Sequence, residues 1–391
     1  MSKNKIQRVT IIGAGPGGLT LARILQLKGV EVKIYEREDS IDVRSQGGTL
    51  DLHVESGQYA LRLAELYDKF QALCRPEGED TIILDKTGTV YYEEVDAGHE
   101  LNRPEIDRQD LRQILLDSLK PDTIAQGHVL RSIECLDNGQ HKLIFDNGVT
   151  DIVDLVVGAD GAWSRVRSLV SNAKPEYCGV SMVEVQFSDV DNQHPEISKL
   201  VGRGTLSALS DNKGLIAQRN GYNRIRVYIT LRVPENWIVE SKIPFDQPDQ
   251  ARARLLDLFS DWNPSLLNFI HSCDDSFVPR RLYALPVGHR WDSKPGVTLL
   301  GDAAHLMSPF AGEGVNLAMF DAADLALAII NADDLEQAIK DYEEKMCTRA
   351  AQSADESARN LDVFIGPGNT GQIVAEFFKK LMASMAANEN A

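Results

Sequence analysis

The stretch VTIIGAGPGGLTLARIL, Val9 to Leu25, decides the fold of this chain. Its first four residues are apolar or β-branched and predict a buried strand, and the glycine-rich turn after them opens an apolar helix over Pro16 to Lys28. A second strand, VEVKIY, follows that helix directly. A strand, a helix and a strand in this order form a βαβ unit, so the sequence predicts an α/β fold with a parallel sheet.

The glycines of this turn match a dinucleotide-binding motif. Gly13, Gly15 and Gly18 form a complete G-x-G-x-x-G, and Glu36 stands at the end of the second strand. Gly13 permits the tight turn, Gly15 lets the backbone approach a pyrophosphate, and Gly18 lets the helix pack on the strand. An acid at the position of Glu36 binds ribose hydroxyls. The motif predicts a dinucleotide site and leaves NAD(P) and FAD both open.

A second glycine turn lies near the other end of the chain, between residues 296 and 330. A short apolar strand there leads to Gly301-Asp302, and a Gly-Glu-Gly turn at 312–314 then opens a long apolar helix. A helix N-terminus favours anionic groups, because its free amides and its dipole are positive. Between the two turns, the run GADG at 158–161 follows another buried strand.

The pattern changes between Cys178 and Arg290, where alternating strands dominate. In the clearest run, RIRVYITLRV, Ile225 and Val227 fall on one face and Arg226 and Tyr228 on the other. Such alternation is typical of an antiparallel sheet with one face in the core, while the polar face either lies in water or lines a pocket. The predicted architecture is a Rossmann-like domain with an inserted antiparallel β-sheet domain and C-terminal helices.

Composition limits the partners of this protein. Its 391 residues contain 41 Lys and Arg against 58 Asp and Glu, a net charge of −17, which repels nucleic acid and anionic membranes. The five cysteines are never in C-x-x-C spacing. We expect no signal peptide in the N-terminal residues and no apolar run long enough to span a membrane. We expect a cytoplasmic monomer that acts on small molecules, with no metal ligand set such as H-E-x-x-H.

The three glycine motifs, in this order, resemble those of the class A flavoprotein monooxygenases, the aromatic hydroxylases of the para-hydroxybenzoate hydroxylase type. The resemblance covers essentially the whole chain and implies that the dinucleotide is FAD, extended between the two glycine turns. It further implies that NADPH reduces FAD and that dioxygen forms a flavin C4a-hydroperoxide, which hydroxylates an electron-rich phenol or enol. No second G-x-G-x-x-G serves NADPH, as is usual in this family.

The resemblance also implies a division of the chain and a set of site residues. Residues 1–177 and 291–330 are expected to form the FAD-binding domain, 178–290 the substrate-binding sheet, and 331–391 a C-terminal helical segment. The cofactor-binding residues are expected to be Gly13, Gly15, Gly18, Glu36, Arg37, Arg44, Arg108, Asp160, Gly301, Asp302, Pro309, Gly312, Gly314, Val315 and Asn316. The substrate-binding residues are expected to be Gln186, Arg226, Tyr228, Pro309, Phe310 and Gly312, and the catalytic ones Pro309, Arg226 and Gln186.

Within the family, RSQGGTLDLH at 44–53 and PEIDRQDLRQIL at 104–115 resemble the TetX-like branch, which inactivates tetracyclines. This implies a tetracycline or a related polyketide as substrate, in antibiotic inactivation. The Arg and His with which that branch holds its drug do not align near Thr205 and at Arg226, so another aromatic or polyketide metabolite stays open. A flavin reductase or dehydrogenase that does not activate oxygen, and a module that only binds FAD, are further alternatives.

Two side chains near the second glycine turn need separate interpretation. Glu313 stands where many members of the family carry Gln, and a carboxylate close to a reduced flavin affects its redox potential. His305 lies in the apolar run AAHLM and is expected to be a packing histidine rather than a base.

Overall fold

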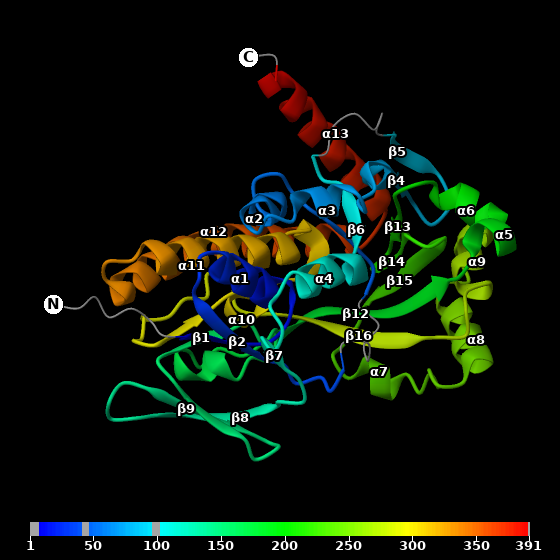
Figure 1. The fold of residues 1–391 in the computed structure, drawn as a ribbon. Coiled ribbons are helices and arrows are strands. Elements are labelled where there is room, and N and C mark those ends of the chain that lie inside the picture. The colour runs from blue at the N-terminus through cyan, green and yellow to red at the C-terminus, as the bar shows by residue number, and fades with distance from the viewer. Residues whose placement is uncertain (1–7, 41–46, 96–101, 390–391) are drawn as a thin grey trace. The chain divides into compact units, whose positions relative to one another are not determined.

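A computed structural model describes residues 8–40, 47–95 and 102–389 (Figure 1). The chain divides into two compact units, each assembled from segments that are distant in the sequence. Unit 1 contains Met1–Cys74, Arg108–Glu176 and Tyr283–Ser357. Unit 2 contains Arg75–Asp107, Tyr177–Leu282 and Ala358–Ala391.

Unit 1 is built on a parallel sheet with the strand order β17-β11-β1-β2-β7. Its strands are β1 (Arg8–Ile12), β2 (Glu31–Tyr35), β7 (Ile124–Ala125), β11 (Leu155–Gly158) and β17 (Val297–Leu299). The register aligns Ile12 with both Tyr35 and Gly158, and Gly158 with Leu299. These four strands therefore end together, so the three glycine motifs leave the sheet along one edge. The predicted parallel α/β architecture is confirmed.

Helices cover one face of this sheet, and a small antiparallel sheet lies on the other (Figure 1). The small sheet contains β8 (Leu130–Cys135), β9 (His141–Phe145) and β10 (Thr150–Val153). The helices that begin in unit 1 are α1 (Pro16–Leu27), α2 (Gly57–Leu63), α3 (Tyr67–Gln71), α4 (Arg108–Asp117), α10 (Asp302–His305), α11 (Gly314–Asn331) and α12 (Leu335–Phe364). The remaining elements of this unit are β3 (Thr49–Asp51) and the 3₁₀ helices η2 (Val166–Leu169) and η3 (Pro309–Ala311).

The long helix α11 lies in the core of unit 1. Its 18 residues have a mean hydropathy of 1.3, which by length and composition is enough to cross a membrane. The expectation that no apolar run reaches this length was therefore wrong. However, α11 packs against α1 and α2, and its buried Asp321 is ion-paired with His305 and Arg349. This packing explains the apolar composition as that of a core helix.

Unit 2 is built on a sheet with the strand order β16-β12-β15-β14-β13-β4-β5. Its strands are β4 (Thr81–Leu84), β5 (Val90–Glu94), β12 (Glu176–Phe187), β13 (Thr205–Ser210), β14 (Lys213–Asn220), β15 (Arg224–Arg232) and β16 (Val278–Ala284). The apolar face of β15 is confirmed, because Ile225, Val227 and Ile229 share one core with residues of α8 (Pro248–Leu258) and α9 (Pro264–His271). The other elements are η1 (Pro76–Glu79), β6 (Glu105–Asp107), α5 (Val190–Gln193), α6 (Pro195–Val201), α7 (Trp237–Glu240) and α13 (Thr370–Glu389).

The sheet of unit 2 differs from the expected one in two respects. It is mixed rather than wholly antiparallel, because β4 pairs with β13 in parallel. The strands β4 and β5 belong to this sheet. The resemblance instead implies that they are part of the FAD-binding domain. Of the two environments left open for the polar face of β15, complete exposure to water is excluded, because Arg226 is 8% exposed and Thr230 is 0% exposed.

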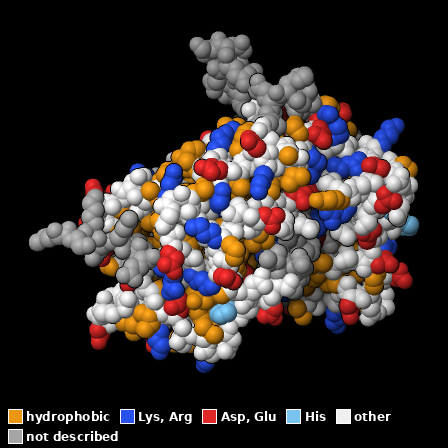
Figure 2. Space-filling view, in the orientation of Figure 1, with side chains coloured by type: hydrophobic (Ala, Val, Ile, Leu, Met, Phe, Trp, Pro, Cys, Tyr) orange, Lys and Arg blue, Asp and Glu red, His pale blue; other side chains and the backbone are white. Residues whose placement is uncertain are grey.

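Charged side chains of both signs are interspersed over the described part of the face shown in Figure 2. Surface ion pairs occur in unit 2, where Lys86 is paired with Asp211 and Asp261. A nucleic-acid-binding face instead gathers Lys and Arg into one basic stripe.

Candidate functional site

The first glycine turn lies where β1 ends and α1 begins. Gly13 has a φ of +107°, and a Cβ there would lie 2.3 Å from the carbonyl oxygen of Ala159. A Cβ on Gly18 would lie 2.3 Å from the carbonyl oxygen of Gly13. Gly15 differs, because none of the described residues beyond its own turn places an atom within 4 Å of a Cβ built there. The turn is tightly packed on its inner side and open at Gly15, which is where a pyrophosphate approaches in this motif.

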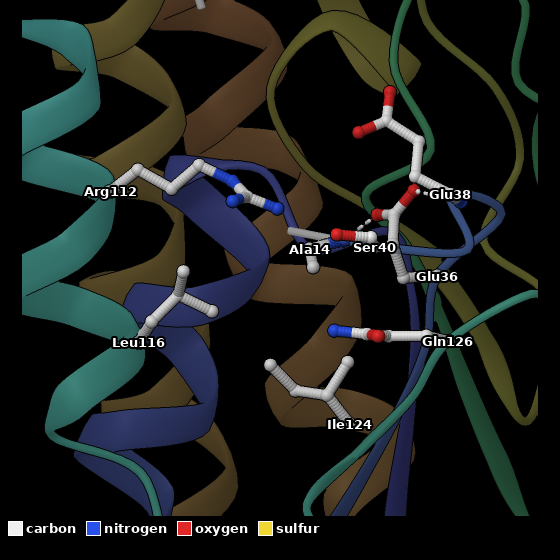
Figure 3. A pocket seen from close by; sticks show the side chains of 8 residues that line it. All are labelled: Ala14, Glu36, Glu38, Ser40, Arg112, Leu116, Ile124 and Gln126. Carbon is white, nitrogen blue, oxygen red and sulfur yellow. Dashed lines mark hydrogen bonds between the residues drawn. The ribbon is translucent and has the colours of Figure 1, made fainter. Parts of the chain in front are cut away.

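Glu36 and α4 border a small pocket beside this turn (Figure 3). The Glu36 carboxylate accepts hydrogen bonds from the backbone N–H groups of Ala14 at 2.6 Å and Glu38 at 3.2 Å. The side chains that line the pocket are those of Ala14, Glu36, Glu38, Ser40, Arg112, Leu116, Ile124 and Gln126. A carboxylate for ribose hydroxyls next to two aliphatic side chains suits the adenosine end of a dinucleotide.

Arg112 is a candidate that the sequence motifs did not single out. Its side chain is 7% exposed and extends from α4 toward Ala14 (Figure 3). A guanidinium beside the glycine turn offers forked donors to a phosphate. Arg112 follows the predicted Arg108 by four residues, so the i, i+4 spacing in DRQDLR is the signal that could have found it. Of the other predicted arginines, Arg37 is exposed in the segment after β2, and Arg44 lies outside the described residues.

Asp302 begins α10, directly after Gly301 and close behind the end of β17. Its side chain reaches solvent, although protein atoms surround much of it. This desolvation raises the pKa of Asp302, against the lowering effect of the positive charges of His305, Arg108 and Arg167. Arg167 is 3% exposed and donates to the carbonyl oxygens of Ala303 at 3.1 Å and Ala162 at 2.7 Å. Arg167 thereby joins the segment after the GADG turn at 158–161 to the start of α10 after Gly301.

Asp160 shapes the GADG turn at 158–161, at the end of β11. Its carboxylate accepts hydrogen bonds from Ser164 Oγ at 2.5 Å and from the backbone N–H of Arg165 at 2.7 Å. Burial nevertheless raises the pKa of Asp160. The structure gives this side chain a local role in the fold, and the predicted contact with the cofactor stays a prediction.

The second glycine turn leads into the first turn of α11. Gly312 has a φ of +69°, and exposed Pro309 begins η3 just before it. Within the described part of the chain, no atom outside α11 itself lies within 4 Å of a Cβ built on Gly314. The first amides of a helix have no partner within the helix. Glu313 is the N-cap residue, but its side chain makes no capping hydrogen bond. Open space and free amides at this point form an anion-binding helix terminus.

The side chain of Asn316 joins the start of α11 to the end of β3 and the residues after it by hydrogen bonds. Its Oδ1 accepts from the backbone N–H of His53 at 2.9 Å, and its Nδ2 donates to the carbonyl oxygen of Asp51 at 2.9 Å. The residue is fully buried. The side-chain amide of Asn316 is thus hydrogen-bonded within the protein. The predicted cofactor contact of Asn316 would therefore be made by its backbone.

His53 is a second residue that the sequence analysis missed. Its Nε2 lies 3.0 Å from Asp51 Oδ2, and its Nδ1 lies 3.4 Å from Glu313 Oε1. Burial alone would lower the pKa of His53, but hydrogen bonds and charges of the two carboxylates raise it to about 10. The imidazole is therefore an imidazolium at neutral pH.

His305 is the buried packing histidine that the sequence predicted. Its Nε2 lies 2.6 Å from Asp321 Oδ2, and the same carboxylate oxygen accepts from the backbone N–H of Gly301 at 3.1 Å. Asp321 is also paired with Arg349 at 3.0 Å. This buried network holds the Gly301 turn on α11 and α12.

The predicted substrate residues of unit 2 lie on neighbouring strands. Gln186 of β12 is paired in register with Arg226 of β15, and Glu184 with Tyr228. The Arg226 guanidinium forms a buried ion pair with Glu184, which also lies 3.0 Å from Arg280 Nε. Arg226 is therefore occupied by a cross-strand pair, whereas Gln186 and Tyr228 are half-buried on the same face.

Comparison with known proteins identifies the cofactor that suits this site. A family model described as FAD binding domain matches residues 7–357. The chain belongs to this FAD-binding family. Monooxygenase asqM of Emericella nidulans is 32% identical, over 96% of this chain and 98% of its own length. Monooxygenase penA of Penicillium thymicola is 30% identical, over 92% of this chain and 96% of its own length. Among solved structures, the tetracycline destructase Tet(51) has a TM-score of 0.71 at 22% identity and covers 98% of both chains.

The protein is thus an FAD-dependent monooxygenase of the class that its three motifs resemble. The residues of unit 1 fit FAD, because Gly15 is open, Glu36 and Arg112 line one pocket, and the first turn of α11 is uncapped by a side chain. One glycine turn follows β1, and the other opens α11.

Proposed function

We propose that this monooxygenase uses NADPH and hydroxylates an electron-rich phenolic or enolic small molecule, such as a tetracycline or a related polyketide. The observation that carries the proposal is the alignment of strand ends in unit 1, which brings the glycine turn after β1 and Gly301 after β17 to one edge of the sheet. The resemblance of residues 44–53 and 104–115 to the tetracycline-inactivating branch supports the substrate class. We place the protein in the cytoplasm.

In this proposal each end of FAD has its own residues. Glu36 binds the ribose hydroxyls of the adenosine, Arg112 and the amides near Gly15 bind the pyrophosphate, and Asp302 faces the ribityl chain. The first amides of α11 face the electron-rich edge of the flavin. Bound FAD supplies the transfer of two electrons from NADPH and the reaction with dioxygen. The protein orients the substrate and excludes water.

For the substrate, we infer that Gln186 and Tyr228 provide the orienting hydrogen bonds. Arg226 is a positioning residue that holds Glu184 and does not itself contact the substrate, because the buried ion pair fixes its guanidinium. This role differs from the direct contact expected from the sequence. The contacts of Pro309, Phe310 and Gly312 with the substrate stay part of the proposal, as does a role for Pro309 in shaping the wall beside the flavin.

The proposal is tested by following aerobic NADPH oxidation by the FAD-loaded protein, with tetracycline and with other phenolic and enolic polyketides. We expect one of these compounds to accelerate NADPH oxidation and to gain one oxygen atom, as detected by mass spectrometry. NADH in place of NADPH measures the nucleotide preference. NADPH oxidation that supports reduction of an acceptor without dioxygen would instead identify a flavin reductase.

Variants of Tyr228 test the substrate face of unit 2. Tyr228→Phe should raise the KM for the accelerating compound, because it removes one hydrogen-bonding hydroxyl. Tyr222→Phe is the matched control, since Tyr222 is 68% exposed. Equal KM values for both variants would remove Tyr228 from the proposed site.

A further inference from the structure

Asp51, His53 and Glu313 form a charge cluster beside the first turn of α11. The His53 side chain is 12% exposed, between Asp51 at 31% and Glu313 at 27%. Asp51 Oδ2 is 3.0 Å from Nε2 of the imidazole, and Glu313 Oε1 is 3.4 Å from Nδ1. Both ring nitrogens of His53 thus point to carboxylates, which only the protonated ring satisfies as a double donor.

The Glu313 carboxylate stands at the start of α11 but does not cap it. Glu313 is the N-cap residue of α11, where free amides and the helix dipole attract an acidic side chain. Its carboxylate makes no capping hydrogen bond and is directed to His53 instead. The first amides of the helix are left without this side chain as an acceptor.

The histidine that holds Glu313 is itself anchored to the helix. The backbone N–H of His53 donates to Asn316 Oδ1 at 2.9 Å. On the other side, a Cβ on Gly312 would lie 3.4 Å from Asp51 Oδ2, so the Asp51 carboxylate packs on the turn itself. The cluster therefore keeps a fixed position relative to the amides that Glu313 leaves free.

We propose that His53 is a positioning residue that holds the Glu313 carboxylate away from the first-turn amides of α11 and so keeps these amides available to FAD. The inference rests on the proposed function, which places the flavin at this helix end. Without the imidazolium, Glu313 turns to the amides and acts as an internal anion. The negative charge of the reduced flavin is then opposed more strongly than that of the oxidised form, so the midpoint potential falls.

The experiment compares the FAD-loaded wild type with His53→Gln, Glu313→Gln and the double variant. Two readouts are the flavin midpoint potential and the dissociation constant of oxidised FAD. We expect His53→Gln to weaken the binding of reduced FAD relative to oxidised FAD by about tenfold. For a two-electron couple this ratio corresponds to a fall of about 30 mV. The double variant should return to the potential of Glu313→Gln, because residue 313 then has no carboxylate to turn to the amides, and Asp51 is the same in both variants.

Controls separate this role from a structural one. Thermal unfolding of each variant shows whether it is folded, and His271→Gln, on the exposed end of α9 in unit 2, is the matched histidine control with an unchanged potential. The inference is overturned if His53→Gln leaves the potential unchanged, or lowers it equally whether or not Glu313→Gln is present. A folded wild type that binds no FAD would instead overturn the proposed function.

Discussion

The imidazole of His53 lies between two carboxylates, and this determines how stability depends on pH. Burial alone would lower the pKa of His53, but Asp51 and Glu313 raise it from 6.5 to about 10. A raised pKa in the folded state adds stability that is complete below the unfolded pKa and is lost as the pH rises through the folded one. We expect the wild type to exceed His53→Gln in stability by at most about 5 kcal/mol near pH 6, at about 1.4 kcal/mol per pKa unit.

The measurement is urea unfolding of the wild type and His53→Gln between about pH 6 and about pH 10.5. The difference in unfolding free energy should shrink steadily from about pH 6.5, the unfolded pKa of His53, to about pH 10, its folded pKa. A difference that stays constant over this range would show that the imidazole is not charged in the folded protein.

Asp321 is the residue whose loss should cost unit 1 most. Its carboxylate is 1% exposed and accepts from His305, Arg349 and the backbone N–H of Gly301. Burial would raise the pKa of Asp321, but the charges of His305 and Arg349 and these hydrogen bonds lower it. Asp321→Asn leaves the buried His305 without its anion and removes the inner of the two carboxylates paired with Arg349, which costs about 3–5 kcal/mol of unfolding free energy.

Asp324→Asn provides the control for that loss. Asp324 is 28% exposed and forms only the outer ion pair with Arg349, 3.0 Å away. Partly exposed pairs contribute about 1 kcal/mol or less. Chemical denaturation of the two variants should therefore separate them by at least about 2 kcal/mol. Equal losses would contradict the buried network as the anchor of the Gly301 turn.

Among the elements, the turn between β1 and α1 separates folding from cofactor binding. A Cβ on Gly18 would lie 2.3 Å from a backbone oxygen, so Gly18→Ala should destabilise the fold by about 1–3 kcal/mol or more. Gly15 has an ordinary φ of −78° and open space around it. Gly15→Ala should keep the unfolding free energy within about 1 kcal/mol of the wild type.

The same Gly15→Ala change should weaken FAD binding more than about tenfold, or 1.4 kcal/mol, because the new methyl group occupies the path of the pyrophosphate. Calorimetric titration with FAD measures this directly. Full FAD affinity in folded Gly15→Ala protein would mean that the cofactor does not pass over this turn.

The sequence predicts local elements of this fold better than their long-range partners. Strand, glycine turn and α1 follow from spacing within one segment, and so does the buried face of β15. The parallel pairing of β4 with β13 has no such signal, because pairing between distant segments depends on the tertiary fold. For the same reason no local pattern predicts that His53 lies beside Glu313, or that Arg226 is buried against Glu184.

At the scale of the whole molecule, three distant motifs meet at one aligned edge of the unit 1 sheet, and the chain belongs to an FAD-binding family. A net charge of −17 makes the local cations at this edge, such as Arg108 and Arg112, more important for an anionic cofactor. The central claim is that this cofactor is used to transfer one atom of dioxygen to a small molecule.

The most direct test is turnover under ¹⁸O₂, with FAD, NADPH and the compound that accelerates NADPH oxidation most, followed by mass spectrometry of the product. The account predicts one ¹⁸O atom in each product molecule and one NADPH consumed for each. A product that takes its oxygen from water, or that gains no oxygen while NADPH is consumed in equal amount, would contradict it.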